Sequence, residues 1–92
     1  MTKTAQAGAQ APAAGLTGRP AQLLAEIRRQ RGRWNATRTV RLYRRITDLP
    51  DTRLRAVARG DLRDLAAWGY LVLHDEPSNR YYTLNSRKDV RP

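Results

Sequence analysis

The sequence contains no cysteine and only one histidine, His74. Zinc fingers, iron–sulfur clusters, disulfide frameworks and thiol catalysis all need side chains that are missing or too few here. We therefore expect a fold that forms without a metal or another cofactor, and a structural role for His74.

Long apolar runs are also missing. The longest, over residues 65–73, is far shorter than the roughly 20 residues that cross a bilayer. The residues after Met1-Thr2-Lys3 lack the apolar segment of a secretory signal. The sequence predicts a protein with no membrane partner whose compartment is the cytoplasm.

Negative charge is scarce. Lys and Arg total 18 against 8 Asp and Glu, which gives a formal net charge of +10 in 92 residues. Eight arginines and three aspartates lie between residues 37 and 63, so half of the net charge falls in one segment. This balance favours an acidic partner, and double-stranded DNA, in association with the nucleoid, is the first expectation.

Composition divides the chain into three parts. Residues 1–19 are mainly Ala, Gly, Thr and Gln, with too little bulky apolar surface to offset the entropy of ordering. We interpret them as a flexible tail, residues 20–85 as one domain, and residues 86–92 as a frayed end. The tails could still contact a protein partner.

Apolar spacing and turn residues predict the elements of the domain. They are a helix over 20–31, a short extended piece over 33–35, a helix capped by Thr37 that ends near Thr47, a helix over 52–68 preceded by Asp51 as a cap, and a hairpin of strands 70–75 and 80–84. This order is typical of a winged helix-turn-helix domain, an α+β fold that is mainly α with a small β-hairpin. Leu71, Leu73, Tyr82 or Leu84 would cover the helices, depending on the register.

The helix over 52–68 has two contrasting faces. Leu54, Ala58, Leu62 and Leu65 form an inner face, and the opposite face carries Thr52, Arg53, Ala56, Arg59, Gly60, Arg63 and Ala67. Small residues let a helix approach base edges, and arginines reach guanine or phosphate oxygens. We predict that this helix enters the major groove, and the competing interpretation is a solvated basic face.

The preceding helix and the hairpin supply further candidates. Thr37, Arg38 and Arg41 would contact phosphates, while Arg44 and Arg45 could instead pair with nearby aspartates. Arg80 at the hairpin tip could probe a minor groove or lie in an exposed loop. The full predicted DNA-binding set is Thr37, Arg38, Arg41, Thr52, Arg53, Arg55, Arg59, Arg63 and Arg80.

Aromatic residues and catalytic motifs give little support to other functions. Trp34, Tyr43 and Trp68 fall where packing is expected, so stacking on single strands is the weaker interpretation. The sequence has no Gly-rich phosphate loop and no nucleophile motif, and so small a domain leaves little room for a cavity of a few hundred Å³. We predict that the protein is not an enzyme and has no catalytic or metal residues.

Part of the sequence resembles a known family. The run Val57-Ala58-Arg59-Gly60-Asp61-Leu62, followed by Leu65 and by Gly69-Tyr70-Leu71-Val72-Leu73, is similar to the third helix and first wing strand of DeoR-type winged helix-turn-helix regulators. Trp34, Leu42-Tyr43-Arg44 and Arg80-Tyr81-Tyr82-Thr83 also look like small winged-helix proteins of GC-rich bacterial genomes, plasmids and phages.

The resemblance implies roles for two residues, Arg59 as a DNA contact and Asp61 as a brace for the helix-turn-helix. Val57 and Gly60 depart from the family pattern, which has a hydroxyl residue and a second Arg there, so base readout could differ. No effector-binding domain follows in this sequence.

The leading hypothesis is a small transcriptional regulator that binds DNA. The alternative is a winged-helix module that docks on an acidic protein in a replication or transcription complex, and RNA binding is a third. A homodimer is possible, but the sequence does not predict one.

Overall fold

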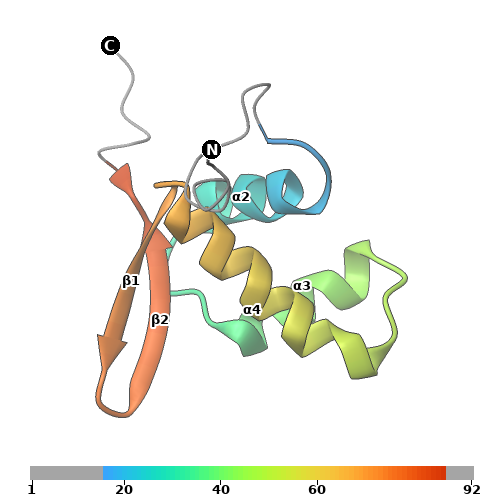
Figure 1. Ribbon diagram of the computed structural model, residues 1–92. Coiled ribbons are helices and arrows are strands. Elements are labelled where there is room, and N and C mark those ends of the chain that lie inside the picture. Colours follow the sequence, from blue (N-terminus) through green and yellow to red (C-terminus); the bar gives the residue numbers. More distant parts are fainter. Residues whose placement is uncertain (1–15, 87–92) are drawn as a thin grey trace, which may run out of the picture.

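Each expected element is present in the computed structural model, which describes residues 16–86 (Figure 1). The order is α2 (Gly18–Gln30), α3 (Ala36–Ile46), α4 (Asp51–Ala67), β1 (Leu71–Glu76) and β2 (Asn79–Leu84). Three helices followed by an antiparallel hairpin give the α+β, winged-helix-like arrangement that the sequence predicts. The tail residues 1–15 and the C-terminal residues 87–92 lie outside the described residues.

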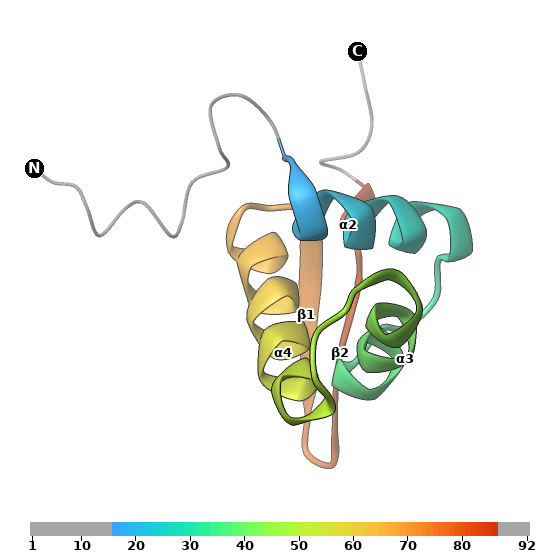
Figure 2. The same cartoon turned by 90° about the vertical axis from the view of Figure 1, so that its right-hand side faces the viewer.

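The three helices lie together on one side of the hairpin (Figure 2). α2 runs across one end, while α3 and α4 lie side by side in front of the strands. α2 begins two residues earlier than predicted, so Gly18 and Arg19, assigned to the tail from the sequence, belong to a helix. No helix within residues 16–86 is long and apolar enough to span a bilayer.

A short connection after α2 brings the chain to the hairpin. Arg31 and Gly32 have positive φ angles of 60° and 80° and reverse its direction. Trp34 then forms a single bridge with Tyr82, in which the backbone N–H of each residue donates to the carbonyl of the other at 2.8 and 2.7 Å. The extended piece predicted over 33–35 is therefore one paired residue.

The starts of α3 and α4 correct two predicted caps. The Asn35 side chain, not Thr37, caps α3, and its Oδ1 accepts from the backbone N–H of Arg38 at 2.9 Å. Thr37 lies within the first turn, which leaves its hydroxyl to other partners. Pro50 is the N-cap of α4, and Asp51 is a first-turn residue of that helix.

The hairpin is slightly longer than predicted and has a tighter turn. Glu76 pairs with Asn79, so only Pro77 and Ser78 form the loop. Gly69, just after α4, has a φ of 90°, which glycine adopts more readily than other residues, and Tyr70 precedes β1 instead of beginning it.

The core forms where the helices meet the base of the hairpin. Leu54, Ala58, Leu62 and Leu65 are all buried, as the periodicity of α4 predicts. Among the hairpin candidates Leu71 is buried, and Tyr82 and Leu84 are partly buried against the core. Leu73 is 43% exposed, because the strands extend past the helices toward their turn (Figure 2).

One buried carboxylate connects all three helices. Asp61 of α4, 5% exposed, accepts from the guanidinium of Arg19 on α2 and from the Tyr43 hydroxyl of α3, the latter at 2.7 Å. Burial and the bond to Asp61 raise the pKa of Tyr43 above its ordinary value. The hydrogen bond to Asp61 also raises the pKa of Arg19. These contacts agree with the bracing role that the family resemblance implies for Asp61.

Candidate nucleic-acid interface

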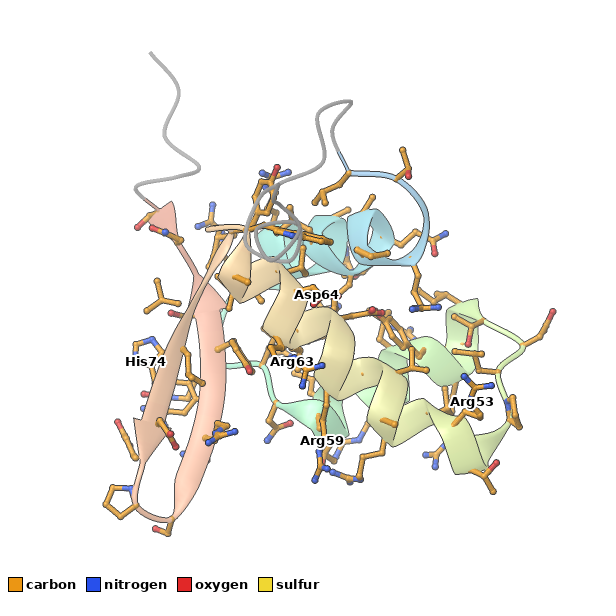
Figure 3. The ribbon with its side chains drawn as sticks, in the orientation of Figure 1. Arg53, Arg59, Arg63, Asp64 and His74 are labelled. Atoms are coloured by element: carbon orange, nitrogen blue, oxygen red, sulfur yellow. The ribbon has the colours of Figure 1, made fainter. Side chains whose placement is uncertain are left out.

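Three arginines form a stripe along the exposed side of α4. Arg55, Arg59 and Arg63 follow one another at four-residue intervals, so each is rotated by only about 40° from the one before it. Arg53 lies away from this stripe, near the turn that joins α3 to α4 (Figure 3). On α4, the candidate interface is therefore this stripe of three arginines and not the whole exposed face of the helix.

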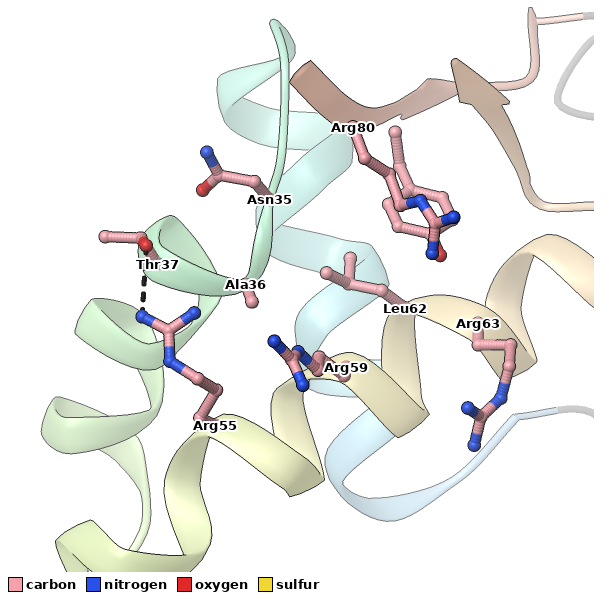
Figure 4. Close-up of a pocket in the computed structure, with 9 residues that line it drawn as sticks. Asn35, Ala36, Thr37, Arg55, Arg59, Leu62, Arg63 and Arg80 are labelled. Carbon is pink, nitrogen blue, oxygen red and sulfur yellow. Dashed lines mark hydrogen bonds between the residues drawn. The ribbon is translucent and has the colours of Figure 1, made fainter. Parts of the chain in front are cut away.

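The stripe borders a pocket of about 610 Å³ between α4, the start of α3 and the hairpin (Figure 4). Its lining residues are Asn35, Ala36, Thr37, Arg55, Arg59, Leu62, Arg63, Arg80 and Tyr82. It brings together five of the predicted DNA-binding residues: Thr37, Arg55, Arg59, Arg63 and Arg80. The sequence predicts little room for a cavity of a few hundred Å³ in so small a domain, and this pocket is larger than predicted.

The arginines of this pocket differ in their contacts. Arg55 donates to the Thr37 hydroxyl at 3.3 Å, which links α4 to the first turn of α3. Arg59 and Arg63 are exposed, and within residues 16–86 neither has a hydrogen-bond or ion-pair partner. Arg80 pairs with Asp75 at 3.1 Å, and this contact raises the pKa of its guanidinium.

The N-terminus of α3 adds to the positive potential of the pocket. Asn35 and Ala36 line it, and the first turn of α3 contains no acidic residue. The N–H groups at the start of a helix and its dipole favour a nearby anion. The pocket lining itself contains no carboxylate.

The predicted phosphate contacts Arg38 and Arg41 lie elsewhere. They line a second pocket of about 490 Å³, whose residues are Gln30, Trp34, Arg38, Arg41, Leu42, Arg44 and Arg45. The two pockets share no lining residue. Arg38 donates to the Arg33 carbonyl at 2.8 Å and to Gln30 Oε1 at 2.9 Å, and it lies over the Trp34 ring at 4.0 Å.

The remaining predicted residues occupy neither pocket. Thr52 and Arg53 are exposed at the start of α4. Of the two arginines for which ion pairing was an alternative, Arg44 approaches Asp51 at 3.5 Å, whereas Arg45 has no salt-bridge partner in the described part of the chain.

The aromatic residues mainly serve packing. Trp34 and Tyr43 are buried in the core, and Trp68 is partly buried against it. On the other face of the hairpin, Tyr81 is stacked on His74 with ring centroids 4.7 Å apart, and Arg33 lies 4.6 Å from the Tyr81 ring centre. His74 Nε2 is 2.8 Å from the Thr83 hydroxyl, in keeping with a structural role.

Several site residues escape sequence reasoning. Asn35 has a visible signal, because Asn is a stronger helix cap than Thr. Tyr82 and Ala36 have no comparable signal in the sequence. They line the pocket only because Trp34 pairs with β2 and because of where α3 lies. No group of three His, Asp or Glu side chains within residues 16–86 is arranged to hold a metal ion.

Comparison with known proteins gives no further assignment. No protein-family model, no curated protein and no solved structure matches the chain. The class that the structure defines is a small winged-helix-like domain, and the likeness to DeoR-type regulators remains a resemblance of the motifs named above.

Proposed function

We propose that the protein binds double-stranded DNA by placing α4 in the major groove, with the start of α3 and the hairpin on the flanking phosphates. The observation that carries this proposal is the convergence of Arg55, Arg59, Arg63 and Arg80 on one pocket whose lining has no carboxylate. Arg38 and Arg41 are outside this pocket and are not included in the proposed interface.

The dimensions of α4 suit this role. An α-helix with its side chains is about 10–12 Å in diameter, which matches a major groove about 12 Å wide. Ala56 is exposed beside the arginine stripe, and a methyl group at Gly60 would meet nothing closer than Arg63 at 3.8 Å. Because these two side chains are small, the helix backbone can come close to base edges there. The neighbouring arginines supply the positive charge.

The biological role that fits this binding mode is regulation of transcription. We infer a binding protein and not an enzyme, because the pocket is lined by arginines, two small polar residues, two apolar residues and a tyrosine, with no paired acid and base. The second candidate function is docking on an acidic protein, which the arginines that line the other pocket favour.

The test is fluorescence anisotropy with a labelled GC-rich duplex over a series of salt concentrations. If the four pocket arginines each neutralise one phosphate, log affinity should fall with log salt at a slope of about −3.6. The double variant Arg59→Ala with Arg63→Ala should bind more weakly and reduce the slope by about 2.

The matched control removes the same charge from exposed residues of the other end of the molecule. Arg29→Ala with Arg31→Ala changes the last turn and the cap of α2, outside both pockets. The proposal requires this control to bind almost as tightly as the parent protein. Equal losses in the two double variants, or no binding at low salt, would refute it.

A further inference from the structure

We propose that Asp75 is an internal competitor for DNA at the hairpin: its carboxylate occupies Arg80 in the free protein, and a phosphate of the duplex has to displace it. This inference rests on the proposed function and deepens it, because it assigns a residue that limits the affinity of the same interface. Removing the Asp75 carboxylate should therefore tighten DNA binding.

Arg80 differs from the other arginines of the pocket beside α4 in its partner. Its guanidinium donates from Nε to Asp75 Oδ1 at 3.3 Å and from Nη2 to Oδ2 at 3.1 Å. Arg55 reaches only the neutral Thr37 hydroxyl, and the two remaining arginines of the pocket have no hydrogen-bond or ion-pair partner within residues 16–86. Among the described residues, Arg80 is therefore the one pocket arginine whose charge is already balanced by a carboxylate.

The register of the hairpin places this pair. Asp75 of β1 and Arg80 of β2 lie directly opposite each other. Side chains in such a cross-strand position are close enough to interact. Beyond them the next pair, Glu76 with Asn79, closes a loop of only Pro77 and Ser78. The ion pair is therefore a fixed consequence of how the two strands align.

The free end of the hairpin has an excess of negative charge. Residues 75–80 contain two carboxylates, Asp75 and Glu76, and a single cation, Arg80. The other three arginines of the pocket belong to α4, and no carboxylate lines the pocket itself (Figure 4). The α4 side of the pocket therefore attracts a phosphate, while the hairpin side opposes one.

A carboxylate and a phosphate use the same donors of a guanidinium, because each accepts two parallel hydrogen bonds from its planar fork. In the free protein one edge of the Arg80 fork, Nε with Nη2, is taken by Asp75. A phosphate on the remaining N–H groups would share one cation with a carboxylate, and the two anions would repel each other. The Asp75 and Arg80 side chains are 57% and 63% exposed, so water screens their attraction and the exchange is reversible.

The experiment measures the affinity of the full chain for the labelled duplex by fluorescence anisotropy at about 0.1 M salt. Asp75→Asn removes the carboxylate and keeps the size of the side chain. It is measured in the parent protein and again together with Arg80→Ala. Thermal unfolding followed by circular dichroism checks that each variant folds.

Two controls accompany these variants. Glu76→Gln removes the same charge one residue away, from a carboxylate that contacts the Tyr81 hydroxyl at 3.4 Å and has no contact with Arg80. Asp75→Glu keeps the carboxylate at the same position. A purely structural role of Asp75 in the hairpin predicts no gain of affinity in any of the variants.

We expect Asp75→Asn to tighten duplex binding by about two- to fivefold, the range that an exposed ion pair allows. Glu76→Gln and Asp75→Glu should change the affinity by less than about 1.5-fold. In the presence of Arg80→Ala, the gain from Asp75→Asn should disappear, because the competition needs the guanidinium.

Three outcomes would overturn the inference and leave the proposed function standing. Unchanged binding of Asp75→Asn would mean that no competition exists, and weaker binding would mean that Asp75 orients Arg80 for DNA. An equal gain from Glu76→Gln, or a gain that persists with Arg80→Ala, would assign the effect to overall charge. A parent protein that does not bind the duplex at low salt would remove the proposed function and this inference together.

Discussion

The two sides of α4 are made from the same helix and have opposite chemistry. The inner side buries Leu54, Ala58, Leu62 and Leu65 and ties Asp61 to two other helices. The outer side exposes Arg55, Arg59 and Arg63 next to small residues. Like charges at four-residue spacing repel one another and destabilise a helix slightly, so the outer side opposes the fold that the inner side stabilises.

This contrast indicates that stability and binding can be changed separately. A substitution on the inner side should lower the free energy of unfolding and affect DNA binding only through loss of folded protein. A substitution on the outer side should change affinity and leave the fold intact. Four predictions test this separation, in order of decreasing expected effect.

The largest effect is expected from Leu65→Ala. Leu65 is fully buried, and removing it deletes apolar contacts and leaves a cavity, so the free energy of unfolding should fall by about 2–5 kcal/mol. Urea unfolding followed by circular dichroism measures this change. A loss below about 0.5 kcal/mol would mean that the inner side of α4 does not hold the core together.

Arg59→Ala should weaken the free energy of binding to the duplex by about 1–3 kcal/mol if the Arg59 side chain contacts a base. Its stability should stay equal or rise by a few tenths of a kcal/mol, since two like-charge neighbours, Arg55 and Arg63, lose a repulsive partner. Arg53→Ala is the control within the same helix, because Arg53 is exposed and outside the pocket. Anisotropy titrations should show the smaller loss for Arg53→Ala, and equal losses would indicate binding by overall charge.

Stability should decrease as pH rises above about 10, the ordinary pKa of tyrosine. Folding raises the pKa of Tyr43, so in alkali the unfolded chain releases a proton that the folded chain retains. The slope of the free energy of unfolding should approach about −1.4 kcal/mol per pH unit from this residue. Denaturation series from pH 9 to 11 measure it, and Tyr43→Phe should flatten the curve; an unchanged slope would contradict the buried bond to Asp61.

The smallest effect is expected from Gly60→Ala. Gly60 lies inside α4, and its new methyl group would meet only Arg63 at 3.8 Å, so the variant should gain about 0.5–1 kcal/mol of stability. If a base edge lies against this position, duplex affinity should fall at the same time. A more stable variant with full affinity would show that the outer side of α4 does not touch DNA at Gly60.

The sequence predicts the two sides of α4 because helical periodicity is a local property. The order of elements follows in the same way from caps, turn residues and alternating strands. Local patterns do not predict the burial of a residue when that burial depends on how distant segments pack against each other. Leu73 alternates correctly and is nevertheless exposed, because its burial depends on how far the hairpin extends past the helices.

The candidate site shows the same limit. The spacing of Arg38 and Arg41 on α3 places them on one side of that helix, and only the packing of α2 and Trp34 assigns them to the second pocket. The Asp61 bonds are a similar case, since Arg19 sits 42 residues away in a segment whose composition suggests a tail. Pairings of this kind are not encoded in any short stretch of residues.

The single bridge between Trp34 and Tyr82 joins the back of one pocket to the wall of the other. The Trp34 ring lies under Arg38, and the two hydrogen bonds of its backbone hold Tyr82, which lines the pocket beside α4. A displacement of Trp34 therefore moves the hairpin directly, with no intervening residue. In so small a protein, one pair of backbone hydrogen bonds thus connects residues that line two separate pockets.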